Sequence, residues 1–307
     1  MGGQIDMAFS LASNSRVSAV PDSGAPMRVG LIGKGIQLSR TPSMHVAEGR
    51  AQGLALQYDL IDPDALPGPE PALAEMLDAA EAAGFAGVNV TFPYKRAVID
   101  HLDVLSDAAQ KVGAVNTVVF RDGGRSGHNT DFWGFAESVR QGLSGAPMET
   151  VLLLGAGGAG GAVAHALKSL NVARLMIFDT DRAAAETLAA DVGAEAVSDL
   201  ARAAARADGI VNATPMGMAK LPGTAIPVEL IDPGHWVADI VYFPLETELL
   251  RAARAKGCRT LDGSGMAVFQ AVRAFSLFTG LTPDANRMRA TFEAFSAPET
   301  TKTQQGG

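Results

Sequence analysis

Four short stretches of the sequence gather polar side chains of the kinds that hold and transform a small ligand. They read QLSRTPSMH, NVTFPYK, GAVNT and GHNTDFWGF, and each comes near the end of a predicted strand, where α/β proteins build their sites. Hydroxyls, amides, one lysine and one aspartate suit a ligand with several hydroxyl groups. The residues concerned are Ser39, Thr41, Asn89, Thr91, Lys95, Asn116, Asn129 and Asp131.

A glycine-rich loop, GAGGAG at residues 155–160, forms a second candidate site. Gly155, Gly157 and Gly160 fit the pattern G-x-G-x-x-G, and the loop lies between an apolar strand and a predicted helix. In that context glycines allow a tight turn and let the backbone approach a pyrophosphate, which the helix N-terminus attracts. The alternative is a flexible joint in a glycine-rich chain, and the strand-loop-helix context favours phosphate binding.

The residue expected to select the nucleotide is Asp179, at the end of the next predicted strand, RLMIFD. A carboxylate there accepts hydrogen bonds from both ribose hydroxyls of NAD and repels the 2′-phosphate of NADP. We therefore expect NAD as the cofactor. Arg182 leaves NADP open, because a guanidinium can hold that phosphate. Asp179 could instead only cap the helix that follows.

Two runs of alternating strands and helices must position these residues. Residues 28–131 follow a β-α-β-α-β rhythm, which predicts a mostly parallel sheet covered by helices. Within them, Arg121 to Gly124 suit a tight turn between two short strands. A second rhythm begins at Val151, and its strands are continuous apolar runs, as expected for a parallel sheet buried on both faces.

The fold class that we predict is α/β, with a substrate domain, a Rossmann-type dinucleotide-binding domain and a C-terminal helix that returns to the first domain. The substrate-binding and catalytic domain is predicted at 27–131, completed by residues from about 264–292, and the NAD-binding domain at 132–263. The Gly/Ser/Pro-rich stretch QGLSGAPMET lies near the junction. Residues 1–26 and 297–307 are predicted to be flexible.

Composition excludes several classes of protein. The net charge is −8 with scattered basic residues, which gives no electrostatic footprint for nucleic acid. The single cysteine, Cys258, cannot form an intrachain disulfide, and no segment approaches ~18 uninterrupted apolar residues. His128 has no second histidine at metal-ligand spacing, so we expect no metal. We expect a cytoplasmic monomer or homodimer with no nucleic-acid or membrane partner.

The polar stretches also resemble those of the shikimate dehydrogenase family, and most closely its NAD-dependent quinate/shikimate dehydrogenase branch. The family's Ser-x-Ser-Pro is SRTP here, its Asn-Val-Thr-x-Pro-x-Lys is NVTFPYK, Gly-Ala-Val-Asn-Thr is unchanged, and Asn-Thr-Asp is NTD. In the second unit GAGGAGGA, NATPMGM and DGSGMAVFQA also match. The ordered set spans about residues 28–292 and is far more specific than any single motif.

The resemblance implies a reversible hydride transfer between a nicotinamide ring and a ring carbon that bears a secondary alcohol. Shikimate would become 3-dehydroshikimate, or quinate 3-dehydroquinate. It makes Lys95 and Asp131 the catalytic pair. It assigns the substrate carboxylate to Ser39 and Thr41, and the substrate hydroxyls to Thr91, Asn116, Tyr242 and Gln270. The cofactor contacts that follow are Gly155, Gly157, Gly158, Ala159, Asp179, Arg182, Ala213, Thr214, Pro215, Met216, Ile240, Gly263 and Met266.

Elementary chemistry supports a lysine and an aspartate for this reaction. Reduction of a ketone develops negative charge on oxygen, and an ammonium at hydrogen-bond distance stabilises that charge and delivers the proton. Oxidation needs the reverse, a lysine that accepts a proton. Asp131 can orient both Lys95 and the substrate hydroxyl.

Each candidate also has a purely structural interpretation. Lys95 could be a solvated side chain, and Asp131 could be the N-cap of the helix that follows it. Ser39 and Thr41 could cap the helix that starts near Pro42. Asn116 and Gln270 could be satisfied core amides, and Tyr242 a packed strand aromatic.

Three departures from the family pattern bear on specificity. Thr41 replaces a serine of the commoner biosynthetic enzymes, and this threonine recurs in the quinate-using branch. Phe92 stands where that branch often has a histidine, and Asp179 replaces the phosphate clamp of NADP-dependent members. Two other functions remain open: an NADP-dependent biosynthetic shikimate dehydrogenase, and a nucleotide-binding regulator without catalytic activity.

Overall fold

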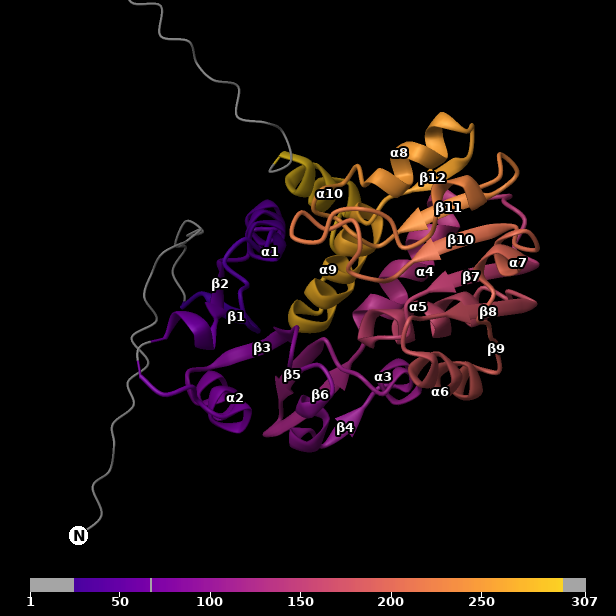
Figure 1. Ribbon diagram of the computed structural model, residues 1–307. Helices are drawn as coiled ribbons and strands as arrows, with labels where there is room; N and C mark the ends of the chain where they lie inside the picture. The colour runs from indigo at the N-terminus through magenta and orange to yellow at the C-terminus, as the bar shows by residue number, and fades with distance from the viewer. Residues whose placement is uncertain (1–24, 67, 295–307) are drawn as a thin grey trace, which may run out of the picture.

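The protein is described by a computed structural model that covers residues 25–66 and 68–294. It contains two six-stranded sheets, each flanked by helices, and the C-terminal helices lie between them (Figure 1). The predicted α/β fold class is confirmed. Most of the two ends predicted to be flexible, residues 1–24 and 297–307, lie outside the described residues, and the predicted domain limits stay a prediction.

The first sheet is mixed, with the strand order β2-β1-β3-β5-β6-β4. Strands β1–β2, β1–β3 and β4–β6 pair in parallel, whereas β3–β5 and β5–β6 are antiparallel. The parallel core therefore ends at a hairpin. The strands are β1 (Met27–Ile32), β2 (Leu56–Ile61), β3 (Phe85–Val90), β4 (Val104–Leu105), β5 (Thr117–Arg121) and β6 (Gly124–His128).

The tight turn predicted between two short strands is confirmed. Strands β5 and β6 are joined by Asp122 and Gly123, which both have positive φ, at 56° and 72°. Two successive positive φ values match the right-handed twist of a hairpin, and aspartate followed by glycine is a favoured pair for them. The hairpin brings Asn116, just before β5, close to the residues that follow β6.

The second sheet is parallel throughout and has the order β12-β11-β10-β7-β8-β9. This is the strand order of dinucleotide-binding folds, in which the order reverses beside the first strand, here β7. Ligands of such sheets bind at the carboxyl ends of the strands at that reversal. The strands are β7 (Thr150–Leu154), β8 (Arg174–Phe178), β9 (Glu195–Ala196), β10 (Gly209–Asn212), β11 (Trp236–Asp239) and β12 (Arg259–Leu261).

Helices cover both faces of each sheet because successive strand residues point to opposite sides. In β7, Val151 and Leu153 join one buried cluster, and Leu152 and Leu154 join another. The helices are α1 (Thr41–Ala51), α2 (Leu73–Ala82), α3 (Asp107–Val112), α4 (Thr130–Gly142), α5 (Gly158–Ser169), α6 (Arg182–Val192), α7 (Leu200–Ala204), α8 (Glu248–Ala255), α9 (Ser264–Thr279) and α10 (Ala285–Ala294). Short 3₁₀ turns are η1 (Pro63–Ala65), η2 (Ala97–His101) and η3 (Val228–Leu230).

Helix α9 returns to the first unit, as predicted. Its Met266 joins the buried cluster of the second sheet, whereas Phe269 and Phe275 join that of the first. It crosses α4 closely: a Cβ on Gly134 of α4 would lie only 2.8 Å from the backbone of α9. The helices α4 and α9 thus join the two units (Figure 1). No helix of the described chain is both long and apolar enough to cross a membrane.

Candidate active site

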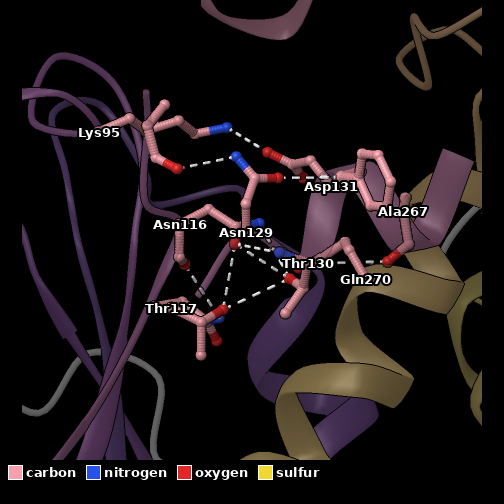
Figure 2. A network of polar contacts seen from close by, with 11 residues as sticks. Lys95, Asn116, Thr117, Asn129, Thr130, Asp131, Ala267 and Gln270 are labelled. Carbon is pink, nitrogen blue, oxygen red and sulfur yellow. Dashed lines mark hydrogen bonds and ion pairs between the residues drawn. The ribbon is translucent and has the colours of Figure 1, made fainter. Parts of the chain in front are cut away.

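Lys95 and Asp131 form an ion pair at the edge of the first sheet. The Nζ atom of Lys95, in the loop after β3, donates to Oδ2 of Asp131, in the first turn of α4, at 2.7 Å. Figure 2 shows the two side chains pointing toward one another. The Lys95 side chain is 27% exposed and that of Asp131 is 12% exposed, so the pair is sheltered yet accessible to a ligand.

The residue that caps α4 is Asn129, not Asp131. Its Oδ1 atom accepts a hydrogen bond from the amide of Phe132, and its Nδ2 donates to the carbonyl of Ala114, both at 3.0 Å. The interpretation of Asp131 as the N-cap is therefore wrong. Because Asn129 serves the first turn, the Asp131 carboxylate is free to face Lys95, and the positive end of the helix dipole favours its negative charge.

Asn116 lies beneath the ion pair and is bound on both sides of its amide by Thr130. Its Oδ1 accepts from the Thr130 amide at 2.7 Å, and its Nδ2 donates to the Thr130 hydroxyl at 2.9 Å. Only 4% of Asn116 is exposed. These are the hydrogen bonds of a satisfied core amide, and its role toward a substrate hydroxyl stays a prediction.

The same polar chain continues into the sheet. The Thr117 hydroxyl accepts from Nδ2 of Asn89 at 3.0 Å, and the Tyr58 hydroxyl donates to Oδ1 of Asn89 at 2.8 Å. The network joins β2, β3 and β5, and through Thr130 it reaches α4 (Figure 2 shows its part around Thr117). It therefore fixes the start of α4, and with it the place of Asp131, relative to the sheet. Tyr58 was not identified from the sequence, because a tyrosine within an apolar strand is typical of a core residue.

Ser39 and Thr91 lie on the neighbouring loops at the carboxyl ends of β1 and β3, and Thr41 is the first residue of α1. The loops are joined through their backbones, since the Lys34 amide donates to the Phe92 carbonyl at 3.0 Å. The side chains of Ser39, Thr41 and Thr91 are all half-buried. The N-cap of α1 is Arg40, which makes no side-chain capping bond. The Ser39 hydroxyl nevertheless accepts from the Thr41 amide at 3.4 Å, so the capping interpretation keeps support for Ser39, and Thr41 is the first residue of the helix.

A surface cluster holds the loop that carries Lys95. The Tyr94 hydroxyl donates to Glu70 at 2.9 Å, and Lys34 donates to the other oxygen of Glu70 at 2.7 Å. Partial burial and the Glu70 carboxylate together raise the pKa of Tyr94 to about 12. Tyr94 thus remains a neutral donor at physiological pH and ties the residue next to Lys95 to the loop around Glu70.

Tyr242 and Gln270 approach the site from the other side. Tyr242 follows β11, is 48% exposed and packs edge to face on Phe292 of α10. Its pKa is raised, first because the packed surroundings disfavour a phenolate. Of the nearby charges, Asp131 raises this pKa further, whereas Lys95 and Arg40 lower it. Its place after the strand contradicts the strand-aromatic interpretation. Gln270, on α9, donates to the Ala267 carbonyl of its own helix at 3.0 Å (Figure 2).

The glycine loop joins β7 to α5 at the reversal of the strand order. Gly155 has φ of +103°, and a Cβ there would lie 2.9 Å from the Ala213 backbone, so only glycine fits. A Cβ on Gly157 or Gly158 would meet no atom within 4 Å. Gly157 is the N-cap of α5, whose first backbone N–H groups point into this open space. These features fit a pyrophosphate.

Asp179 holds the glycine loop and does not cap the next helix. Its Oδ2 accepts from the Ala156 amide at 2.7 Å and its Oδ1 from the Asp181 amide at 2.9 Å. Asp181 is the N-cap of α6 and accepts from two amides of its first turn, so the capping interpretation of Asp179 is wrong. Arg182 is exposed and paired with Glu186 at 2.7 Å.

The remaining predicted cofactor residues gather at the same edge of the second sheet. Ala213 to Met216 follow β10, Ile240 follows β11, and Gly263 and Met266 lie at the start of α9. A Cβ at Gly263 would lie only 2.5 Å from the carbonyl oxygens of Ile240 and Val241, so no side chain fits at this position. The structure brings these residues together, and their contacts with a cofactor stay a prediction. Among the described residues, no group of three or more His, Cys, Asp or Glu side chains is arranged to hold a metal ion.

Comparisons with known proteins agree with this architecture. Residues 31–118 match the model of the shikimate dehydrogenase substrate binding domain, and residues 263–291 match that of the shikimate 5'-dehydrogenase C-terminal domain. The chain is 53% identical over 274 residues to a quinate/shikimate dehydrogenase (NAD(+)) of Corynebacterium efficiens, covering 86% of this chain and 96% of the relative. It is also 53% identical to a shikimate dehydrogenase (NADP(+)) of Streptomyces avermitilis, covering 85% and 93%.

A solved structure shares the whole fold. Quinate dehydrogenase from Corynebacterium glutamicum in complex with NAD superposes with a TM-score of 0.84 at 49% identity, covering 88% of this chain and 99% of the other. The likeness therefore extends over both sheets and the returning helices.

Proposed function

The chain belongs to the shikimate dehydrogenase family, and from this premise we propose that it catalyses the reversible NAD-dependent oxidation of shikimate to 3-dehydroshikimate and of quinate to 3-dehydroquinate. As a member it is an NAD(P)-dependent oxidoreductase. The observation that carries the proposal is the Lys95–Asp131 pair, 2.7 Å apart, at the start of α4, the helix that the returning helix α9 crosses closely.

In the proposed reaction the nicotinamide supplies a hydride acceptor at the carbinol carbon. In oxidation the neutral amine form of Lys95 takes the hydroxyl proton on Nζ as the C–H electron pair leaves, and in reduction the ammonium form returns that proton to the ketone oxygen. Asp131 accepts a hydrogen bond from Nζ and so holds the amine toward the substrate oxygen. Ser39 and Thr41 hold the carboxylate; Thr91, Asn116, Tyr242 and Gln270 hold the hydroxyls. Residues 27–131 with 264–292 form the substrate side.

The preference for NAD rests on Asp179. Its oxygens already accept backbone amides, which fixes the carboxylate beside the glycine loop with lone pairs left for ribose hydroxyls. A 2′-phosphate would meet this negative charge. NADP remains the second candidate, because the Streptomyces relative is equally similar and Arg182 is exposed nearby.

A matrix of initial rates, with NAD or NADP against shikimate or quinate, tests the proposal. We expect the highest kcat/KM with NAD, and turnover of both substrates. A clear advantage for NADP would reassign the role of Asp179. Tight NADH binding without turnover of either substrate would instead favour the nucleotide-binding regulator.

A further inference from the structure

A buried polar cluster lies beneath two loops of the second sheet, and we call it the Asp239 hub. It consists of Asn212, Asp239 and Thr247, which are 0%, 2% and 1% exposed. Asn212 is the last residue of β10 and Asp239 the last of β11, and the two are paired in register. Two polar side chains are therefore placed side by side at the edge where the cofactor is expected.

Asn212 holds the loop of residues 213–217. Its Oδ1 accepts from the Thr214 amide at 3.0 Å and from the Thr214 hydroxyl at 2.7 Å, and its Nδ2 donates to the Met216 carbonyl at 3.0 Å. The second Nδ2 proton goes to Oδ1 of Asp239 at 2.9 Å. All four hydrogen-bonding positions of the amide are thus occupied.

Asp239 holds the loop of residues 241–247. Its Oδ1 also accepts from the Val241 amide at 3.0 Å, and its Oδ2 accepts from the Thr247 hydroxyl at 2.8 Å. Thr247 in turn accepts from the Leu250 amide and so caps α8. One carboxylate therefore joins the loop after β10 to the loop after β11, which carries Tyr242.

The chemistry of the hub is specific to an acceptor with several lone pairs. The three bonds described for Asp239 come from neutral donors, and burial raises the pKa of its carboxyl group. Burying such a group costs stability unless its hydrogen bonds are complete. An aliphatic side chain would fill the space at a lower free-energy cost of burial, but it would leave Asn212, Val241 and Thr247 without their acceptor.

We propose that Asp239 is a positioning residue for hydride transfer. It fixes the loop expected to line the nicotinamide, residues 213–217, relative to the loop that brings Tyr242 to the substrate. The inference rests on the proposed function and names a residue outside its predicted contacts. Because hydride transfer is sensitive to small displacements of the reacting carbons, loss of the hub lowers kcat more than it raises KM.

Three variants test the hub: Asp239→Ala, Asp239→Asn and, as a control, Asp208→Ala. Asparagine keeps an oxygen for Asn212 and Val241 and can donate to the Thr247 hydroxyl. Asp208 accepts the Thr150 amide at 2.8 Å at the opposite end of the same sheet, so its loss removes a comparable bond away from both loops. We expect kcat to fall on the order of 10²-fold in Asp239→Ala. KM for NAD should change less than about threefold, Asp239→Asn should recover most of kcat, and Asp208→Ala should keep the wild-type kcat.

Two outcomes would overturn the proposal. A normal kcat per folded molecule in Asp239→Ala would reduce the hub to a structural role. Equal losses in Asp239→Asn and Asp239→Ala would mean that the charge matters and the geometry does not.

Hydrogen exchange separates this proposal from the proposed function, because it needs no turnover. The amides of Thr214, Met216 and Val241 should exchange faster in Asp239→Ala and not in Asp208→Ala. If the wild type turns over neither substrate but exchange accelerates, the reaction is wrong and the hub still holds both loops. If exchange does not change, the hub does not hold them.

Discussion

The two halves of the candidate site are built from different parts of the chain. At the edge of the first sheet, side chains form the surface that would face the proposed ligand: Lys95 and Asp131 meet at 2.7 Å above a network of amides and hydroxyls. At the edge of the second sheet, backbone N–H groups and open space around Gly157 and Gly158 face it. There the carboxylates of Asp179 and Asp239 bind loops.

This difference predicts different vulnerabilities. The first half should fail when atoms are removed, because each reacting group is a single side chain. The second half should fail when atoms are added or a loop is released, because its ligand surface is backbone. Substitutions in each half therefore test whether the two halves fail in these different ways.

The largest effect is expected from Lys95→Ala. Removing the proton acceptor should lower kcat on the order of 10³-fold, while KM for shikimate changes little, since the lysine acts chiefly in the transition state. Steady-state kinetics measure both. Lys111→Ala, which removes an exposed lysine on α3, is the matched control and should leave kcat unchanged. A parallel rise in KM would make Lys95 a ground-state contact.

A smaller effect, confined to the nucleotide, is expected from two glycine variants. In Gly155→Ala the positive φ and the clash with Ala213 should raise the Kd of NADH on the order of 10²-fold and lower stability, because the turn cannot form unstrained. Gly157→Ala should keep stability within about 1 kcal/mol but still weaken NADH binding, because its methyl group enters the phosphate space.

Fluorescence titration of NADH and calorimetry with shikimate distinguish the two halves. The shikimate affinity of Gly157→Ala should equal that of the wild type. Unchanged NADH affinity in Gly157→Ala would show that the open space is not where the pyrophosphate binds.

A still smaller shift is expected from Asp179→Ser. Loss of the carboxylate should raise the ratio of kcat/KM for NADP to that for NAD on the order of tenfold, equivalent to about 1.4 kcal/mol. The control is Asp181→Ser, which removes one charge two residues away and keeps a side chain able to cap α6. Equal shifts in both variants would assign selectivity to the general charge of the loop.

The sequence predicted the parts of the fold that depend on local pattern. Strand and helix periodicity, the hairpin at Asp122 and the glycine turn are local, and all are present. The apolar residues of α9 recur at helical spacing, which predicted the helix but could not show where it packs; the structure shows it packed on both clusters.

The roles of residues that depend on the exact start of a helix, or on which strands are neighbours in the sheet, could not be predicted in the same way. Asn129 and Asp131 are both good N-caps, as are Asp179 and Asp181, and which one caps is decided by where the first turn begins. The pairing of Asn212 with Asp239 is set by the order of strands that lie far apart in sequence. The sequence feature that could have pointed to Asn212 and Asp239 is that each is a polar residue at the end of an otherwise apolar strand.

The last of these effects, equal in free energy to the Asp179 shift, concerns the stability of the first half and comes from His45. This histidine of α1 is fully buried beside Tyr58, Phe275 and Phe278, and both ring nitrogens lack a hydrogen-bond partner. Burial lowers its pKa from 6.5 to about 3, because the charged ring would be desolvated. Below pH 6.5 the unfolded chain therefore binds a proton that the folded protein does not, and stability decreases as pH falls toward about 3.

At pH 5.5 the resulting loss should be about 1.4 kcal/mol relative to pH 8, and urea denaturation across pH 5–8 measures it. This range lies above the ordinary pKa of Glu48, whose bond to Arg287 lowers its pKa further and keeps it charged throughout. His45→Leu should remove this part of the dependence and leave the part due to His128, whose pKa burial and Arg273 also lower. Val46→Ala, a buried neighbour without a titrating group, should lower stability equally at every pH. If His45→Leu retains the wild-type slope, protons bind elsewhere and the acid sensitivity does not belong to the core of the first half.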